Sequence, residues 1–178
     1  MRTVSPTAIL DFWFKQERKA WFGKDPAFDD LIRARFLHCY ETAIAGGLEG
    51  WKSGPQGSLA LVVLLDQFAR NMFRGTARAF AADPIALDTA RLIVERGWDK
   101  AMTPDERTFA YLPFEHSEDM ADQELSLKLF SDNPNFDWAR RHRDIIRRFG
   151  RFPHRNAILG RASTPEETEF LEQPGSGF

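Results

Sequence analysis

The sequence predicts an all-α protein, and three observations support this fold class. Capping residues followed by proline recur along the chain of 178 residues, as is typical of helix starts. Glycines follow the apolar periodic segments, at the places where helices should end. No segment alternates polar and apolar residues for long enough to indicate a strand. We therefore expect antiparallel helical hairpins, with about eight helices joined by short loops.

Six pairs of a capping residue and a proline mark the helix starts. They are Ser5-Pro6, Asp25-Pro26, Asp83-Pro84, Thr103-Pro104, Asn133-Pro134 and Thr164-Pro165. Two of these starts carry a capping box, completed by Glu106 and Glu167. Ser58 and Ser117 are further cap candidates. With the apolar stripes, these signals predict helices over about 6–16, 26–45, 58–74, 84–96, 104–112, 118–131, 134–149 and 165–172. Pro113 should end or kink its helix.

Length and composition predict one cytoplasmic domain. A chain of 178 residues with 43% hydrophobic residues can bury a full core. The net charge of −2 predicts no general attraction to nucleic acid or membranes. A single cysteine excludes an intramolecular disulfide, and no run indicates a membrane span or a leader. We expect a domain over 1–178, with an ordered core over about 5–172 and a frayed tail at 173–178.

The central stretch Ser58–Arg74 differs from the other predicted helices. Its first half is apolar on every side, which is typical of a helix in the middle of a domain. Its second half carries a polar face at helical spacing, formed by Asp66, Gln67, Arg70, Asn71 and Arg74. The sequence therefore predicts polar side chains in or near the interior.

Two further polar groups follow along the chain. A mostly acidic group, Glu115–Asp119, comes directly after Pro113. A mostly basic group includes Arg151, His154, Arg155 and Asn156. Acidic and basic groups could simply pair with one another, because buried charges are tolerated in that way. The same residues could instead form a ligand site, and both interpretations stay open.

Other kinds of site are less well supported by the sequence. Acceptable metal ligands are present at His116, His154, Glu118 and Asp119, but no metal-binding motif occurs, so we predict no metal and no cofactor. His142 falls on an apolar helix face and is expected to be a core histidine. Cys39 lies in an apolar arc and is expected to be a buried thiol. The seven arginines of Arg140–Arg155 are typical of a solvated helix face, so we predict no nucleic-acid partner.

Three long runs of the sequence resemble the bacterial family catalogued as domain of unknown function 924. They are LLDQFARNMFRGTARAFAADPIAL, ERTFAYLPFEHSEDMADQELSLKLF and HRDIIRRFGRFPHRNAILGR. The resemblance covers nearly the whole chain and implies a tetratricopeptide-like, right-handed array of helices, but no activity. Ala69 stands where the family pattern has proline, which should leave the helix straighter. The matched motifs single out Asp66, Gln67, Arg70, Asn71, His116, Ser117, Glu118, Arg151, His154, Arg155 and Asn156.

Our main hypothesis is a site for an anionic small molecule or peptide. The anion would be held by Arg70, Arg74, Arg151 and Arg155. Asn71 and Gln67 would orient it, and His116 and Glu118 would form the opposite wall.

Two alternatives come from other classes of protein. The first is a hydrolase of a phosphate or acyl compound, with His116 or His154 as acid or base and Glu118 as a further candidate. Ser117 is a poor nucleophile candidate, because adjacent side chains such as His116 and Ser117 seldom point at each other. The second is an interaction scaffold whose polar groups are purely structural. The sequence leaves the oligomeric state open.

Overall fold

The computed structural model describes residues 4–177, and these residues form helices and turns without a strand. This confirms the predicted all-α class. The first half contains α1 (Pro6–Phe14), α2 (Arg18–Trp21), α3 (Pro26–Ile44), α4 (Pro55–Val62), α5 (Ala69–Met72) and α6 (Asp83–Glu95). The second half contains α7 (Pro104–His116), α8 (Met120–Leu129), α9 (Phe136–Phe149) and α10 (Pro165–Leu171). Short turns of 3₁₀-helix include η1 (Glu49–Ser53), η3 (Ala77–Phe80), η4 (Trp98–Ala101) and η5 (Pro153–Arg155).

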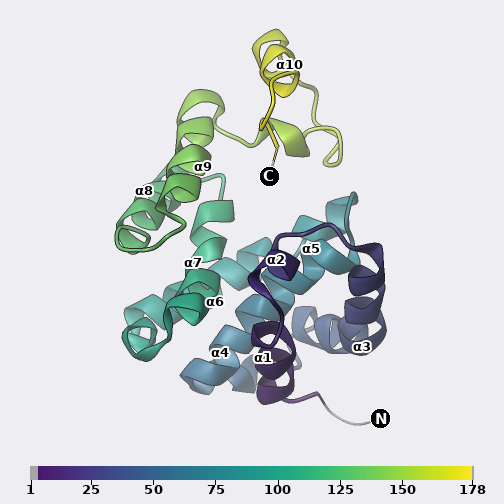
Figure 1. Cartoon of the computed structure of the whole chain (residues 1–178), viewed down its shortest axis with the longest axis vertical. Coiled ribbons are helices and arrows are strands. Elements are labelled where there is room, and N and C mark those ends of the chain that lie inside the picture. Colours follow the sequence, from purple (N-terminus) through teal and green to yellow (C-terminus); the bar gives the residue numbers. More distant parts are fainter. Residues whose placement is uncertain (1–3, 178) are drawn as a thin grey trace.

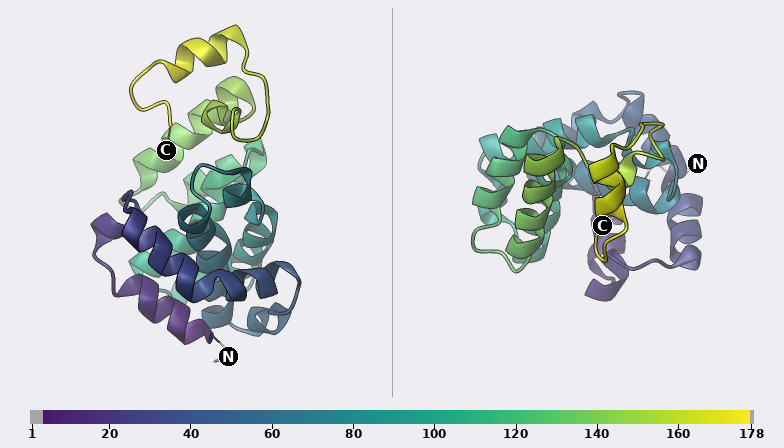
Figure 2. Two further views of the ribbon diagram at one scale, coloured as in Figure 1. Left: turned by 90° about the vertical axis from the view of Figure 1, so that its right-hand side faces the viewer. Right: turned by 90° about the horizontal axis from the view of Figure 1, so that it is seen from above.

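The chain progresses along the long axis of the molecule. Helices α1 and α10 lie at opposite ends of this axis, and α7 leads from the lower part to the α8–α9 pair (Figures 1 and 2). Helix α7 packs against α6 and α8, and α8 packs against α9. The tetratricopeptide-like array itself stays a prediction. Among the residues that the structure describes, no helix combines the length and apolar character needed to cross a membrane.

Four of the six predicted helix starts carry the expected cap. Ser5 Oγ accepts a hydrogen bond from the Ala8 amide, and Asp25 accepts one from the Ala27 amide. Both predicted capping boxes are present, at Thr103 and Thr164.

At the other two starts the predicted cap is wrong, although α6 begins within one residue of its predicted start and α9 begins two residues after it. Asp83 is not the cap of α6 but its first residue, and its carboxylate accepts two hydrogen bonds from Arg70. Asn133 instead bonds the Thr108 hydroxyl and the Asn135 amide, and α9 begins only at Phe136.

The predicted central helix is not one uninterrupted α-helix. Its first part, α4, begins at Pro55, so Ser58 lies inside the helix and is fully buried. A π-helical segment, η2 (Val63–Phe68), then separates α4 from α5. The expectation that Ala69 leaves the helix straighter than proline would stays a prediction. A π-helical turn is wider than an α-turn and is found frequently at functional sites.

The sequence predicts that Pro113 ends or kinks its helix, and the structure shows that it does not end it. Helix α7 continues to His116, and Pro113 is buried within it. The missing backbone hydrogen bond is tolerated because α6 and α8 pack against α7 and hold it in place. The next helix is capped by Asp119, whose side chain accepts from the Ala121 amide, and not by Ser117.

The main core lies between α1, α3, the central segment and α7, and it is rich in aromatic rings. Phe68 contacts the ring of Trp13 edge-on, with 5.5 Å between centroids, and Trp13 contacts Phe109 in the same way at 5.4 Å. Cys39 is 7% exposed, which confirms the predicted buried thiol, and burial raises its pKa to about 11. Edge-to-face rings of this kind stabilise a core beyond their buried area.

A smaller core joins α9 to the C-terminal segment. It contains Ile145, Ile146 and Phe152. Residues 173–177, for which fraying was expected, fold back so that Arg141 donates a hydrogen bond to the Gly175 carbonyl. Residues 1–3 and 178 of the predicted domain lie outside the described residues.

Candidate functional site

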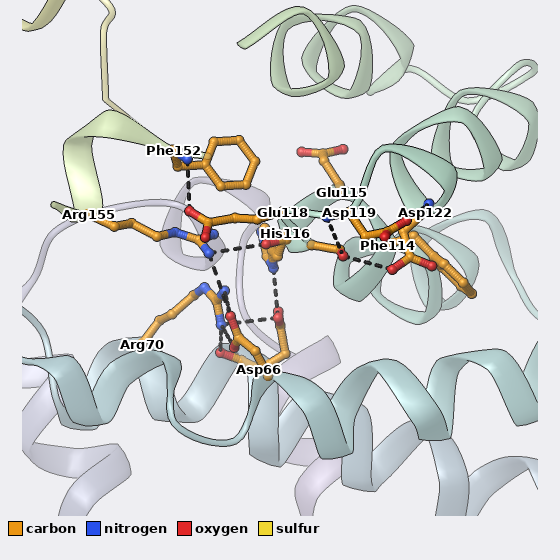
Figure 3. Close-up of polar contacts among 12 residues, drawn as sticks. Asp66, Arg70, Phe114, Glu115, His116, Glu118, Asp119, Asp122, Phe152 and Arg155 are labelled. Atoms are coloured by element: carbon orange, nitrogen blue, oxygen red, sulfur yellow. Dashed lines mark hydrogen bonds and ion pairs between the residues drawn. The ribbon is translucent and has the colours of Figure 1, made fainter. Parts of the chain in front are cut away.

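The centre of the site is Asp66, on the π-helical segment η2. Its side chain is 1% exposed, and it accepts hydrogen bonds from Gln67 Nε2 and, at 2.6 Å, from His116 Nδ1 (Figure 3). Arg70 Nη1 lies 3.1 Å from the carboxylate. Burial alone would raise the pKa of Asp66, but Arg70 and His116 outweigh burial and hold this pKa well below its usual range. Asp66 is therefore a buried carboxylate anion.

Arg70 joins the central segment to α6. Its guanidinium donates two parallel hydrogen bonds to the Asp83 carboxylate, at 2.9 and 3.0 Å, and one to the Asp66 carbonyl. This fork-to-fork arrangement is the strongest geometry for an arginine and a carboxylate. The charge of Arg70 is compensated within the protein.

His116 is the last residue of α7 and lies directly above Asp66 in Figure 3. Burial is the main cause that lowers the pKa of its ring, and the nearby Arg70 lowers it further. A neutral His116 carries its proton on Nδ1, because Asp66 can only accept there. The lone pair is consequently on Nε2, for which the described residues offer no hydrogen-bond partner.

Arg155 approaches His116 from η5 (Figure 3). The residue is 7% exposed, and its guanidinium lies 4.5 Å from the Phe152 ring centre and 4.7 Å from that of Phe80. Its one side-chain hydrogen bond within the described residues goes to the His116 carbonyl, at 3.1 Å. Asp83 lies 3.9 Å away, and the Nε atom is buried without a partner. Burial lowers the pKa of Arg155 to about 10.

A pocket of about 360 Å³ opens beside these residues. Its polar lining consists of Asp83, His116, Ser117, Glu118 and Arg155. The larger part of its wall is apolar and is formed by Ala77, Phe80, Ala81, Pro84, Leu87, Pro113 and Leu159. This volume is in the range of pockets that bind small molecules.

A second buried group lies next to His116. Glu115 is 3% exposed, and its Oε1 atom lies 3.2 Å from Nδ1 of His142 on α9. Burial and the nearby Asp66 raise the pKa of Glu115 to about 8. His142 is 5% exposed and its Nδ1 atom bonds the Trp138 carbonyl at 2.8 Å, which confirms the predicted core histidine.

The four predicted arginines do not converge on one pocket, so that part of the hypothesis is wrong. Arg74 donates two hydrogen bonds to Asp29 on α3, and Asn71 donates to the same carboxylate. Arg151 donates two hydrogen bonds to Glu167 on α10. These carboxylates lie on other elements and draw both arginines away from the pocket, whereas Arg155 lines it.

The remaining predicted residues belong mainly to a structural network. Glu118 accepts from the Phe152 amide and from Arg161, and Asn156 donates to Glu167. Burial lowers the pKa of His154 to about 4. Ser117 Oγ donates to Asp122 and not to His116, as expected for adjacent side chains. Glu118 nevertheless lines the pocket together with His116, as predicted.

Sequence reasoning missed Asp83, Phe80 and Glu115 as parts of the site. Asp83 was interpreted as a helix cap, and Phe80 was not considered. Glu115 was seen only as one member of an acidic run. A helical wheel that extends α7 through Pro113 would have placed Glu115 inside, because it follows the buried Leu112 by three residues.

Comparison with known proteins places the chain among bacterial sequences of unknown function. A family model described as a bacterial protein of unknown function (DUF924) matches residues 9–175. A solved structure of a protein of unknown function from Agrobacterium tumefaciens is similar, with 47% sequence identity and a TM-score of 0.91. The match covers 94% of this chain and 96% of that chain. No curated protein is similar to the chain.

Proposed function

Since the chain belongs to the bacterial DUF924 family, whose description names no activity, we propose a function from the site itself: the pocket binds a small organic anion. Arg155 holds the carboxylate or phosphate of this ligand, and the apolar wall contacts the rest. The observation that carries the proposal is the buried guanidinium of Arg155. Its nearest carboxylate, Asp83, is 3.9 Å away and already bonded to Arg70.

The incomplete pairing of Arg155 is unusual for a buried cation. An ionised group in the interior is costly unless a counter-charge and hydrogen bonds compensate it. Arg70 and Arg161 each have a carboxylate that bonds two of their nitrogens, but Arg155 has one carbonyl and an unpartnered Nε. An anionic ligand would supply the missing acceptor with charge-assisted hydrogen bonds.

The lining favours a ligand that also has an apolar part. Phe80 and Phe152 flank the guanidinium, so they hold its plane in a fixed orientation. Leu87, Pro113 and Leu159 offer apolar contacts on the wall. Inorganic phosphate alone would leave this wall uncovered, and we therefore expect it to bind more weakly than an organic acid.

The test is calorimetric titration with short aliphatic and aromatic carboxylates and their phosphate counterparts. We expect Arg155→Met to weaken binding at least about tenfold, because a charge-assisted hydrogen bond contributes about 1.5–3 kcal/mol. The matched control is Arg74→Gln, which removes an arginine bonded to Asp29 on another element and should leave the affinity unchanged.

Two results would change the proposal. If no carboxylate or phosphate bound, or if Arg155→Met and Arg74→Gln affected binding equally, the pocket would not be an anion site and the scaffold alternative would be favoured. If a bound ester or phosphate were cleaved, the hydrolase alternative with His116 or His154 as acid or base would replace simple binding.

A further inference from the structure

His116 has one ring nitrogen bonded inside the protein and one that is open to solvent. Nδ1 lies 2.6 Å from the Asp66 carboxylate, which can only accept, so the proton of the neutral ring is on Nδ1. The lone pair of the ring is on Nε2, which has no hydrogen-bond partner among the described residues. Nε2 is also not one of the buried polar atoms that lack a partner. A ligand can therefore reach this atom.

The ring of His116 borders the same pocket as Arg155. The His116 side chain is 14% exposed, and the buried Asp66 covers the edge of the ring that carries Nδ1. Nη1 of Arg155 donates to the His116 carbonyl at 3.1 Å, so the guanidinium lies beside the end of α7 that carries the imidazole (Figure 3). A ligand whose anionic group bonds Arg155 thus has the atoms next to that group within reach of His116.

The other polar side chains of the lining are bonded within the protein. Asp83 and Glu118 each accept hydrogen bonds from two nitrogens of an arginine other than Arg155. Ser117 Oγ donates to a carboxylate of α8. The groups of the described lining that call for a ligand are thus the cation of Arg155 and the lone pair of His116.

A lone pair on an imidazole selects ligands that can donate a hydrogen bond. With its proton on Nδ1, the neutral ring accepts from a hydroxyl at Nε2 and cannot donate to a keto oxygen there. A hydroxyl that found no partner in the pocket would weaken binding, because taking a polar group out of water costs free energy. A hydroxylated ligand therefore binds more tightly than its unsubstituted counterpart only where an acceptor meets the hydroxyl.

We propose that the ligand of the pocket is a hydroxy acid, and that His116 selects it by accepting a hydrogen bond from its hydroxyl at Nε2. The carboxylate of the acid bonds Arg155, as in the proposed function, on which this inference rests. The hydroxyl is on the carbon next to the carboxylate, because the guanidinium lies directly beside residue 116. The rest of the acid contacts the apolar wall. Asp66 keeps the proton on Nδ1 and is a positioning residue.

The test is calorimetric titration of the full chain at neutral pH with sets of acids that share a carbon skeleton. Each set contains an unsubstituted acid, its hydroxy acid and its keto acid, with the substituent next to the carboxylate. One set is phenylpropionate, phenyllactate and phenylpyruvate, and the other has an isobutyl side chain. We expect the hydroxy acid to bind at least about threefold more tightly than the other two, because a hydrogen bond between neutral groups changes affinity by about two- to tenfold.

The variant His116→Asn tests the acceptor itself. An asparagine amide can place an N–H group near the position of Nδ1 and keep the hydrogen bond to Asp66, but it has no atom equivalent to Nε2. This variant should lose the preference for the hydroxy acid. The matched control is His38→Gln, which removes an exposed histidine of α3 and should keep the preference. Circular dichroism checks folding, and the wild-type titrations decide the question even if His116→Asn does not fold.

The outcomes separate this inference from anion binding as such. If the acids bind but the hydroxy acid has no advantage in either set, or if the keto acid binds most tightly, the role of His116 is wrong and the anion site stands. The role is also wrong if folded His116→Asn keeps the full preference. If none of the acids binds, this inference and the proposed function both fail.

Discussion

Arg151 and Arg155 come from the same short segment, yet their surroundings differ completely. Arg151 donates two hydrogen bonds to Glu167 and one to the Ala162 carbonyl. Arg155 donates one hydrogen bond to the His116 carbonyl, although it is the more deeply buried of the two. The charge of Arg151 is compensated by a carboxylate of the protein, whereas the charge of Arg155 is compensated only in part. This difference separates a structural ion pair from a candidate ligand anchor.

The comparison assigns stability and binding to different residues. Around Arg151, Glu167 also accepts from Asn156 and from the Thr164 amide of the capping box, so α10 is attached through one carboxylate. Around Arg155, the rings of Phe80 and Phe152 hold the guanidinium without neutralising it. Substitution of Glu167, the partner of Arg151, should therefore reduce the stability of the protein. Substitution of Arg155 should instead reduce anion binding.

The largest effect is expected for Glu167→Ala. This change removes the acceptor of Arg151, Asn156 and the α10 capping box at once, and Glu167 is 2% exposed. We expect the free energy of unfolding to fall by about 3 kcal/mol, because a buried charge network loses its central member. Urea unfolding monitored by circular dichroism measures this change.

The matched control is Glu166→Ala, one residue earlier. Glu166 pairs with Arg148, and both side chains are about half exposed or more. Such pairs contribute less than about 1 kcal/mol, because water screens them. Equal losses of stability for the two variants would contradict the assignment of Glu167 as the residue that attaches α10.

The next effect concerns pH. The hydrogen bonds from Arg151 hold the pKa of Glu167 at about 2, against an ordinary value of 4.5. A lowered pKa in the folded state stabilises the protein above the unfolded value and ceases to do so as pH falls toward the folded value. The stability difference between wild type and Glu167→Gln should be complete at neutral pH and shrink as pH falls from about 4.5 toward 2.

Urea unfolding of both proteins at a series of pH values would show this. The wild-type protein loses other ion pairs in the same range, so the difference between the two proteins is the useful quantity. If the difference in free energy of unfolding between the two proteins stayed constant down to about pH 2, the charge of Glu167 would contribute nothing to stability beyond the packing of its side chain.

Much of the fold could be predicted from the sequence because helix ends are local features. The caps at Ser5 and Asp25 and both capping boxes depend on residues within one turn of each other. The cap at Asp83 failed because a distant residue, Arg70, uses its carboxylate, whereas the Asn133 side-chain oxygen accepts from the Asn135 amide before α9 begins. The π-helical segment was missed because apolar periodicity and helix propensity do not distinguish a π-helical turn from an α-helical one.

The residues of the site could be predicted from the sequence, but the ion pairs between its arginines and carboxylates could not. Asp66, Arg70, His116 and Arg155 were all singled out, and the structure brings them together. Arg74 and Arg151 have the same chemistry in the same motifs, but Asp29 and Glu167 are their partners. Which carboxylate faces which arginine is decided by long-range packing, so residue type and spacing could not separate the two groups.

A smaller effect is expected for Arg74→Gln. The Arg74 side chain is 38% exposed, and Asp29 keeps its hydrogen bond from Asn71 after the substitution. We expect the free energy of unfolding to fall by about 1 kcal/mol or less, because the ion pair is partly screened. Titration with the anion should give the wild-type affinity. A tenfold loss of affinity would mean that Arg74 takes part in the site after all.

The smallest effect on stability is expected at the most buried arginine. Arg155→Met removes a guanidinium whose nearest carboxylate, Asp83, stays bonded to Arg70, so no buried anion is left unpaired. The thioether can pack between Phe80 and Phe152, which offsets the loss of the bond to His116. The free energy of unfolding should therefore change by no more than about 0.5 kcal/mol, measured in urea, while anion binding weakens at least about tenfold. A fall of several kcal/mol would instead make Arg155 a structural residue like Arg151. Removing an arginine destabilises the protein strongly only when carboxylates and carbonyls of the protein pair with its charge.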